Sequence, residues 1–516
     1  MREVPSGAVD ACGDARGGAV RAHIPYSRAL SARVLAFVAA LFAPHAAPAQ
    51  GVRVTGFSSL EYYELMPVAQ DSVPVSQTIG SGTERDSPVG TVSCPSVSGS
   101  CYYFKSLSRA HTLPLVQDIE ATGWGLGTGI SAYVHVRARG SLGGVDDLYP
   151  RENDHFDALA AYLEVDRGRV VARAGRQWLT SQLGLNNFDG ASVDLRLGES
   201  FSVLGYGGWS LIEGLSEPPT SAALAAADFL PPDSRGLLVG TKVRFRSPSG
   251  VALSAEYQRE IRTDRAGLYS ERVALDGSAR IGAARLDGEV QADLATGALN
   301  ELSLRATHRL AASITGTIEA RHYTPYFPLW TIWGVFSPVG YNEARAEARW
   351  SSSAQTVSLS ADASYRRYED THTGLAFLPL RDDGWHVGAN ASWRPRANWL
   401  VSGSYGRDIG FGASQSEGTA GLRWTPSDRG YVGVTGTAFQ NIYEFSVGSG
   451  TVTGVIANAG LRLSPNLRLA GDAAIYQHIG KDMPRVVNWS QRRASLRLEW
   501  TLGTDPGMRA PRAGTR

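Results

Sequence analysis

Apolar and polar side chains alternate one by one along much of the chain after residue 50. Residues 237–246 show the pattern clearly, with an apolar or Thr side chain at every odd position and the charges of Lys242, Arg244 and Arg246 on the even ones. Successive side chains of a strand leave opposite faces, so this period of two predicts a strand with one apolar face and one charged face. Residues 247–250 read Ser-Pro-Ser-Gly, a turn composition, and the alternation resumes at Val251, which predicts a hairpin.

The same alternation recurs almost to the end of the chain. It is found in residues 355–366, 385–393, 455–463 and 494–502. These segments are about ten residues long, which is longer than the usual soluble strand and matches a strand that crosses a bilayer at a tilt. A half-exposed sheet of a soluble sandwich would give the same pattern over one hairpin, but its connections have no reason to alternate in length.

Connections between the predicted strands alternate between short and long. The short ones are 166–169, 247–250, 394–398, 426–430 and 464–466, and the long ones are 65–112, 213–234, 324–341, 370–382 and 479–488. Tight periplasmic turns and long outer loops are typical of barrels in bacterial outer membranes. Aromatic residues at the ends of apolar rows, namely Trp385, Trp393, Trp399 and Tyr257, fit girdles at the two membrane interfaces.

We therefore predict an all-β fold, a transmembrane up-and-down antiparallel barrel of about 22 strands, with 18 or 20 also compatible with the pattern. The assignment is weakest around 114–138 and 267–309. Strand pattern begins at Val52, which leaves no room for a plug domain ahead of the barrel. A barrel of this width has space for an aqueous lumen.

The first 49 residues read as a leader and signal peptide. Arg28 and Arg33 precede the apolar run VLAFVAALF, and small residues at Ala47 and Ala49 predict cleavage after Ala49. Residues 50–503 are then the outer-membrane barrel, and the Gly-, Pro- and Arg-rich residues 504–516 a disordered tail. Cys94 and Cys101 remain in the mature chain, and we predict that they form a disulfide, as an exported protein permits.

Charged residues on the inward parity are candidates for lining the pore. They are Arg176, Lys242, Arg244, Arg246, Glu256, Asp362, Arg366, Arg462, Arg468, Asp472, Arg497 and Glu499. Arginine rings would favour anionic solutes, whereas arginines paired with carboxylates on neighbouring strands would only brace the wall. The sequence leaves both interpretations open.

Motifs of catalysis, metal binding or cofactor attachment are not found, so we expect neither an enzyme nor a metal or cofactor site. A net charge of +1 gives no polyanion-binding surface, so nucleic acid is not an expected partner. The expected partners are outer-membrane lipid and the barrel-assembly machinery. The apolar stretch 323–338 is either a contact for a protein partner or a loop packed in the mouth of the barrel.

Residues 175–190, GRQWLTSQLGLNNFDG, resemble the G-R-Q … F-D-G signature of outer-membrane porins of the alginate-export type. The matching positions are Gly175, Arg176, Gln177, Phe188, Asp189 and Gly190. Such a stretch suits a tight outer hairpin, with glycines for close backbone approach and an Arg and an Asp able to pair across it. The resemblance implies a porin-like channel for diffusion or export of small or anionic solutes. Similar signatures occur in barrels that sheathe electron-transfer cytochromes, so a sheath for a partner protein is the alternative. A hydrolase at the outer rim, built around His372, is a third and weaker reading.

Overall fold

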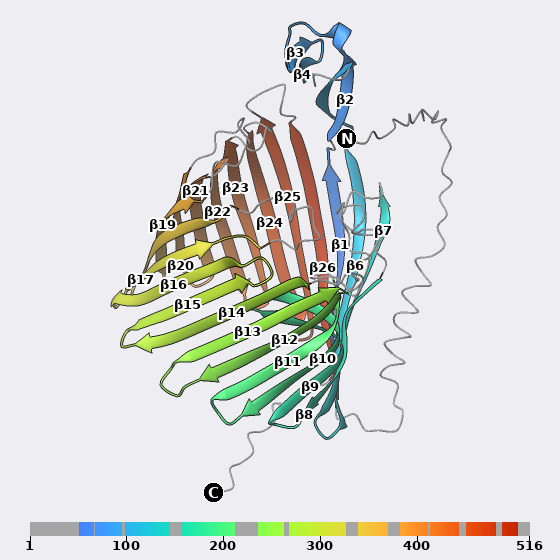
Figure 1. Ribbon diagram of the computed structural model, residues 1–516. Helices are drawn as coiled ribbons and strands as arrows, with labels where there is room; N and C mark the ends of the chain where they lie inside the picture. Colours follow the sequence, from blue (N-terminus) through green and yellow to red (C-terminus); the bar gives the residue numbers. More distant parts are fainter. Residues whose placement is uncertain are drawn as a thin grey trace, which may run out of the picture. The chain divides into compact units, whose positions relative to one another are not determined.

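Twenty-two antiparallel strands form one closed ring in the computed structural model (Figure 1). The structure describes residues 51–66, 68–94, 99–144, 156–211, 236–262, 268–326, 339–369, 382–410, 413–442, 450–480 and 488–503. The ring consists of β1 (Gly51–Leu65), β6 (Ala110–Gly127), β7 (Ile130–Gly144), β8 (Phe156–Asp166), β9 (Val170–Ser181), β10 (Gly184–Leu197), β11 (Phe201–Leu211), β12 (Gly236–Arg246), β13 (Ala252–Arg262), β14 (Leu268–Ile281), β15 (Ala284–Asp293), β16 (Ala298–Ala311), β17 (Ile314–Tyr323), β18 (Tyr341–Ser351), β19 (Val357–Tyr368), β20 (Asp383–Arg396), β21 (Trp399–Gly410), β22 (Ala413–Ser427), β23 (Gly430–Ile442), β24 (Gly450–Ser464), β25 (Leu467–Gly480) and β26 (Trp489–Gly503).

Closure depends on β1, the first strand, which pairs on one side with β6 and on the other with β26, the last. Every other strand of the ring pairs with its neighbours in chain order, from β6–β7 to β25–β26. A closed antiparallel ring leaves no free sheet edge, which is the requirement for a sheet that crosses a membrane. The predicted barrel of 22 strands is confirmed.

The short connections predicted from the sequence lie at one end of the ring and the long ones at the other, but this second end also has short connections, at 182–183, 294–297 and 411–412. The two regions of weakest assignment resolve into β6 and β7 and into β14, β15 and β16. In residues 267–309 the connections do not alternate between short and long, because β14–β15 and β15–β16 are both joined by only a few residues. The leader at 1–49, the tail at 504–516, the apolar residues 327–338 and His372 lie outside the described residues. The same holds for residues 221–230, SAALAAADFL, whose composition is compatible with a short helix folded inward.

The two faces of the wall differ as the alternation predicts. Large exposed apolar side chains line one face, for example Val239, Leu275, Ile318 and Ile475, while the facing parity carries the charged residues. On the apolar face, Tyr365 packs on Trp385 near the long-loop ends and Trp399 stacks on Trp424 near the turns. Apolar rows that end in aromatic rings are the pattern of a surface in contact with lipid, and the protein is an outer-membrane barrel.

A small four-stranded sheet interrupts the ring sequence between β1 and β6. It consists of β2 (Val68–Pro74), β3 (Glu84–Ser87), β4 (Gly90–Ser93) and β5 (Ser100–Ser106) in the order β2-β5-β4-β3, with a three-residue 3-10 helix η1 (Val75–Gln77). No described helix is long and apolar enough to cross a membrane. The predicted Cys94–Cys101 disulfide is present, and both sulfurs lie in a small core with Val73 and Val92.

An exposed ion pair joins the two long strands of this sheet. The Lys105 ammonium donates to Oδ2 of Asp71 at 2.5 Å, and the Ser72 amide donates to the same carboxylate at 2.8 Å. Both donors hold the pKa of Asp71 below its ordinary value, with the lysine contributing most. The small sheet therefore has only a small core and polar surface contacts, which makes the disulfide its main constraint.

Replacing both Cys94 and Cys101 with alanine should open the small sheet and leave the barrel intact. Loss of a disulfide that closes a loop of this length costs about 2–3 kcal/mol. We expect trypsin to cleave after Arg85 and Lys105 much faster than in the parent protein, while heat-modifiable migration of the barrel on gels stays unchanged. Equal cleavage rates in the two proteins would contradict this assignment.

Candidate functional site: the barrel lumen

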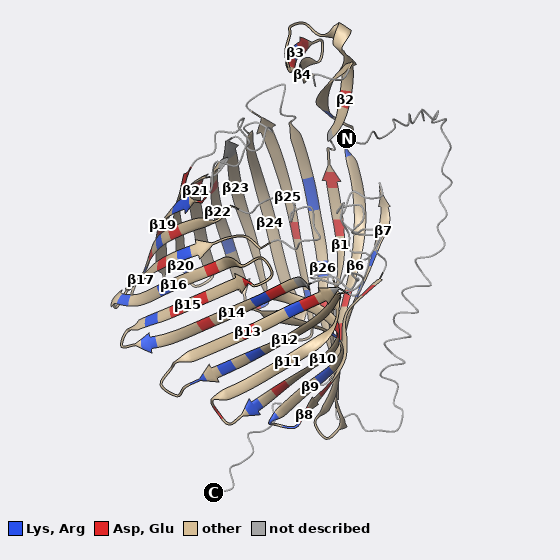
Figure 2. Ribbon diagram, viewed as in Figure 1, with Lys and Arg blue, Asp and Glu red and all other residues tan. Residues whose placement is uncertain are grey.

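The lumen is lined by charged side chains, and most of those in the middle of the wall are paired. Arg305 contacts Glu319 at 2.7 Å, and Arg321 contacts Glu301 at 2.9 Å, each pair joining β16 and β17. Figure 2 shows red and blue segments interleaved along neighbouring strands of the wall. Adjacent strands therefore satisfy each other's charges, which is the bracing arrangement that the sequence left open.

A longer network runs from β18 to β21. His386 lies between Asp362, at 3.1 Å, and Asp408, at 3.0 Å. Arg366 contacts Asp408 at 3.4 Å and Glu343 at 2.9 Å. The network joins four strands through side chains alone, so it stiffens the wall where the luminal face is wide and polar.

Eleven of the twelve predicted pore-lining residues share the luminal face in the strand register. Lys242 contacts Glu256 at 3.5 Å, Arg244 contacts Asp194 at 2.6 Å, and Glu499 lies 3.6 Å from Arg468 and 3.2 Å from Arg497. The others of this set are placed on the same face by register: Arg246, Asp362, Arg366, Arg462 and Asp472.

Arg176 differs from the other eleven, because it lies on the opposite parity. In the register it stands opposite Ala161 and Asp189, one residue away from the luminal Gln177. Its guanidinium donates to both carboxylate oxygens of Asp189, at 2.7 and 2.9 Å, and to the carbonyl oxygen of Ala158 at 3.1 Å. Arg176 therefore joins β8 to β10.

The pairing of β8 with β9 breaks off part of the way along the wall, and this break explains the position of Arg176. Their pairing stops at Ala161 and Arg176, although β9 continues to Ser181. Gly175 has φ of 130°, a conformation that side chains other than glycine rarely adopt, and a Cβ there would meet the Ala161 carbonyl oxygen. Beyond Arg176 β9 pairs only with β10, and the Ala158 carbonyl, which has no partner on β9, accepts a hydrogen bond from the Arg176 side chain.

Residues 177–188, the end of β9 and the start of β10, are called here the inward hairpin. Its base is apolar: Phe188 is fully buried and packs with Tyr206 of β11 and Leu238 of β12. The Phe188 and Tyr206 rings are 5.8 Å apart. Burial of a phenylalanine side chain stabilises by about 2–3 kcal/mol, so the base is firmly held.

The tip of the inward hairpin makes polar contacts with the luminal face of three other strands. Gln182 accepts a hydrogen bond from Lys242 of β12, and Asn186 exchanges two hydrogen bonds with Gln258 of β13, at 3.0 and 3.1 Å. The Leu183 carbonyl accepts from Arg272 of β14 at 2.7 Å. These partners are 60 to 89 residues away in sequence, so the hairpin lies over the inner wall and narrows the lumen.

The G-R-Q … F-D-G stretch is therefore the hairpin that folds inward, with its ion pair at the bend. The sequence identified these residues and predicted that the Arg and Asp pair. It predicted a tight outer hairpin, however, and the structure corrects this, because the positive φ of Gly175 turns the hairpin into the barrel.

Arginines accumulate beside the short connections at the turn end of the lumen. Figure 2 shows basic segments close to several of these turns. The exposed arginines in or next to these turns include Arg167, Arg169, Arg196, Arg246, Arg280, Arg309, Arg349, Arg394, Arg396, Arg429 and Arg462. Fewer described carboxylates, such as Asp166, Glu199 and Asp428, adjoin the same turns. This mouth of the lumen is therefore basic, unlike the paired middle of the wall.

A cavity of about 700 Å³ at this end is lined by five arginines, listed here: Arg423, Arg429, Arg462, Arg468 and Arg497. The Arg423 guanidinium lies 4.0 Å from the centre of the Tyr431 ring, and Arg497 lies 3.7 Å from the centre of the Phe57 ring. Glu499, Asp428, Asp118 and Glu120 also line it, so the arginines outnumber the carboxylates by one. The cavity is open and suits small anions better than cations.

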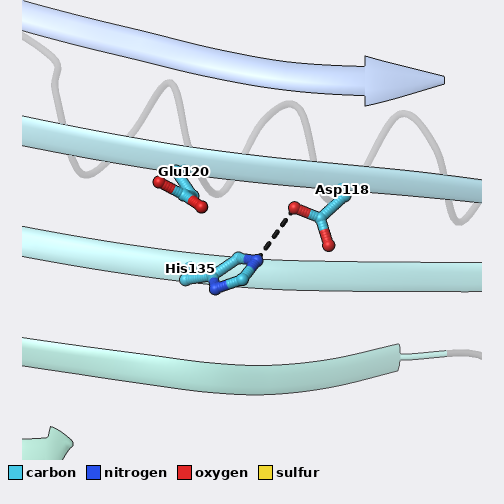
Figure 3. A group of neighbouring side chains, drawn as sticks. All are labelled: Asp118, Glu120 and His135. Carbon is cyan, nitrogen blue, oxygen red and sulfur yellow. Dashed lines mark hydrogen bonds and ion pairs between the residues drawn. The ribbon is translucent and has the colours of Figure 1, made fainter. Parts of the chain in front are cut away.

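Asp118, Glu120 and His135 bring three oxygen or nitrogen donors within 4.8 Å of one another on the luminal face of β6 and β7 (Figure 3). His135 Nε2 lies 2.8 Å from one oxygen of Asp118, and Arg137 lies 2.7 Å from the other. Both Asp118 oxygens are thus engaged by protein groups, and the cluster is accounted for as an ion pair. The sequence alone does not bring the three residues together, because His135 comes from the neighbouring strand; the spacing of two between the acids is the only signal in the sequence of this part of the wall.

Comparisons with known proteins find only distant likenesses. No protein-family model and no curated protein matches the chain. Among solved structures it is similar to Acinetobacter baumannii OccAB2 (10% identity, TM-score 0.37, 88% of this chain and 98% of that one) and Pseudomonas aeruginosa OpdQ (9%, 0.38, 88% and 98%). It is also similar to the outer membrane channel DcaP of Acinetobacter baumannii (10%, 0.30, 50% and 99%).

Replacing Arg176 with alanine should destabilise the barrel wall at the place where the pairing of β8 with β9 stops. The change removes a bidentate ion pair and the donor to the Ala158 carbonyl, and hydrogen bonds of charged groups contribute about 1.5–3 kcal/mol. We expect a loss of about 2 kcal/mol in the free energy of unfolding by urea in lipid vesicles.

Arg305→Ala is the matched control, because its pair with Glu319 joins strands with a complete ladder and its side chain is about half exposed. Its loss should cost about 1 kcal/mol or less. An equal loss of unfolding free energy in the two variants would show that Arg176 does not stabilise the wall where β8 and β9 separate.

Proposed function

We propose that the chain is a diffusion channel for small anionic solutes across the bacterial outer membrane. The observation that carries this proposal is the distribution of luminal charge: carboxylates pair with arginines in the middle of the wall, whereas arginines are in excess at the turn end. Because tight turns face the periplasm, the basic mouth is the periplasmic one. A positive mouth concentrates anions and repels cations.

Resemblance of residues 175–190 to alginate-export porins supports the same class of solute, since those porins conduct an anionic substrate. The resemblance does not define the solute of this chain. The inward hairpin narrows the lumen, which favours small solutes over a polymer of large cross-section.

A barrel that sheathes a partner protein is the second candidate, and the hairpin argues against it. A sheath needs a lumen wide enough for the partner, whereas Phe188 and the hairpin tip are packed against four luminal strands, β11 to β14. The third candidate, a hydrolase at the rim, depends on His372, which lies outside the described residues. Diffusion therefore fits the described geometry best.

Neutralising the arginines of the turn-end cavity should lower the preference for anions. With Arg423, Arg462 and Arg468 all changed to alanine, we expect the chloride-to-potassium permeability ratio, from reversal potentials across a planar bilayer in a salt gradient, to fall by about threefold. The effect should shrink at high salt, where the field is screened.

The control changes Arg305 and Glu319 together to alanine and glutamine, which removes one luminal pair without altering the net charge. Its permeability ratio should match the parent's. A parent protein that carries no current, or a triple variant that keeps the parent's ratio, would refute the proposed function.

A further inference from the structure

Two segments that leave the barrel wall meet at one buried arginine, Arg272 of β14, which is 8% exposed. One guanidinium nitrogen donates to the Leu183 carbonyl at the tip of the inward hairpin, at 2.7 Å. Another donates to the Gln291 side chain of β15 at 3.3 Å. The guanidinium also lies 4.0 Å from the centre of the Tyr326 ring, in the segment that follows β17.

Tyr326 itself is fixed to the same strand. Its hydroxyl donates to Ser270 Oγ at 3.0 Å, two residues from Arg272 on the luminal face of β14. The hairpin tip and the start of the β17–β18 connection thus reach one short stretch of wall from different directions. Arg272 touches each of these two segments directly.

An arginine suits this position for geometric reasons. Its planar group can donate in two directions while an aromatic ring stacks on its face, which a lysine ammonium cannot do. Asp293 stands opposite Arg272 in the register and its carboxylate accepts from the Ala295 amide and the Thr296 hydroxyl, both at 2.9 Å. The buried guanidinium thus donates to a carbonyl oxygen of the inward hairpin and to a side-chain oxygen of β15, and the Tyr326 ring lies against it.

We propose that Arg272 is the latch that fixes the hairpin tip over the luminal wall and thereby sets the size limit of the passage. The inference rests on the proposed channel function and names the residue that determines its exclusion limit. Arg272 acts through the hairpin, so it is a positioning residue rather than a group that binds the solute.

The energetics of the hairpin favour release of the tip while the base stays in place. The base is held by Phe188 against Tyr206 and Leu238, an apolar contact that water does not replace. At the tip the Leu183 side chain is also buried, and the remaining contacts are hydrogen bonds, which water can replace. Loss of the charged donor to the Leu183 carbonyl should therefore loosen residues 182–186 and leave Phe188 packed.

The space beside the tip is of the size of a small solute. A cavity of about 440 Å³ lies between Gln182 and the charged luminal residues of β14 to β17. Its three arginines, Arg285, Arg305 and Arg321, are each paired with a carboxylate. Displacement of the tip would join this space to the rest of the lumen and admit larger molecules.

The test compares the full-length mature protein with Arg272→Ala and Arg272→Lys in planar bilayers. Single-channel conductance should rise by about twofold in Arg272→Ala, because conductance follows the free cross-section, and the size of neutral polyethylene glycol that enters the pore should increase. Arg272→Lys keeps the positive charge but loses the planar guanidinium that donates in two directions, so the conductance of this variant should rise as well. If conductance rises in Arg272→Ala but not in Arg272→Lys, the positive charge of residue 272 determines the conductance, and the proposed latch is refuted.

The matched control is Arg345→Ala, which removes another luminal arginine, paired with Asp362 at 3.1 Å and distant in sequence from the hairpin. Its exclusion limit should remain that of the parent. As a second route to the same state, Gln182→Ala combined with Asn186→Ala removes two side-chain contacts of the tip and should raise conductance without touching Arg272.

Deuterium exchange separates failure of the latch from failure of the channel. In Arg272→Ala the amides of residues 182–186 should exchange faster, and those around Phe188 should not. If the parent conducts but Arg272→Ala leaves both the exclusion limit and this exchange unchanged, the latch is refuted and the channel stands. If the parent carries no current, the channel is refuted, and the exchange data alone decide whether Arg272 holds the tip.

Discussion

Backbone hydrogen bonding in a medium without water is the constraint on which the structure depends. Each N–H or C=O group left unpaired in hydrocarbon costs several kcal/mol, so a sheet that crosses a membrane must close. The pairing of β1 with both β6 and β26 provides that closure. Once the ring is closed, alternation along each strand follows, because one face meets lipid and the other meets water.

The ring is incomplete at one described place, and the candidate site depends on it. Where β9 turns inward at Gly175, the carbonyl of Ala158 loses its strand partner, and the Arg176 side chain supplies a donor in its place. The wall thus tolerates a departure from regular pairing because a charged side chain supplies the hydrogen bond that the neighbouring strand does not. The strand that departs becomes a hairpin in the lumen, where it can affect passage.

Much of the fold could be predicted from the sequence because it depends on local rules. The period of two, the rhythm of connections and the aromatic ends of rows predict a barrel of about 22 strands, and the loop composition between Cys94 and Cys101 predicts the disulfide. The register that pairs Lys242 with Glu256, or His386 with two aspartates, could not be read, because pairing joins residues on different strands. The inward hairpin could not be predicted either, because a glycine in a strand pattern does not reveal the sign of its φ. For the same reason the alternation predicts Arg176 on the luminal face, whereas the structure has it on the other.

The most direct test of the two-sided wall is a nitroxide scan along β12, with single spin labels at residues 237–245 of the protein in lipid vesicles. Collision with oxygen, which concentrates in hydrocarbon, should be high at Leu237, Val239, Thr241, Val243 and Phe245. Collision with a water-soluble nickel complex should be high at the residues between them, and lower at Leu238, which the inward hairpin covers. A profile without this period of two, or one with the two parities exchanged, would contradict the account.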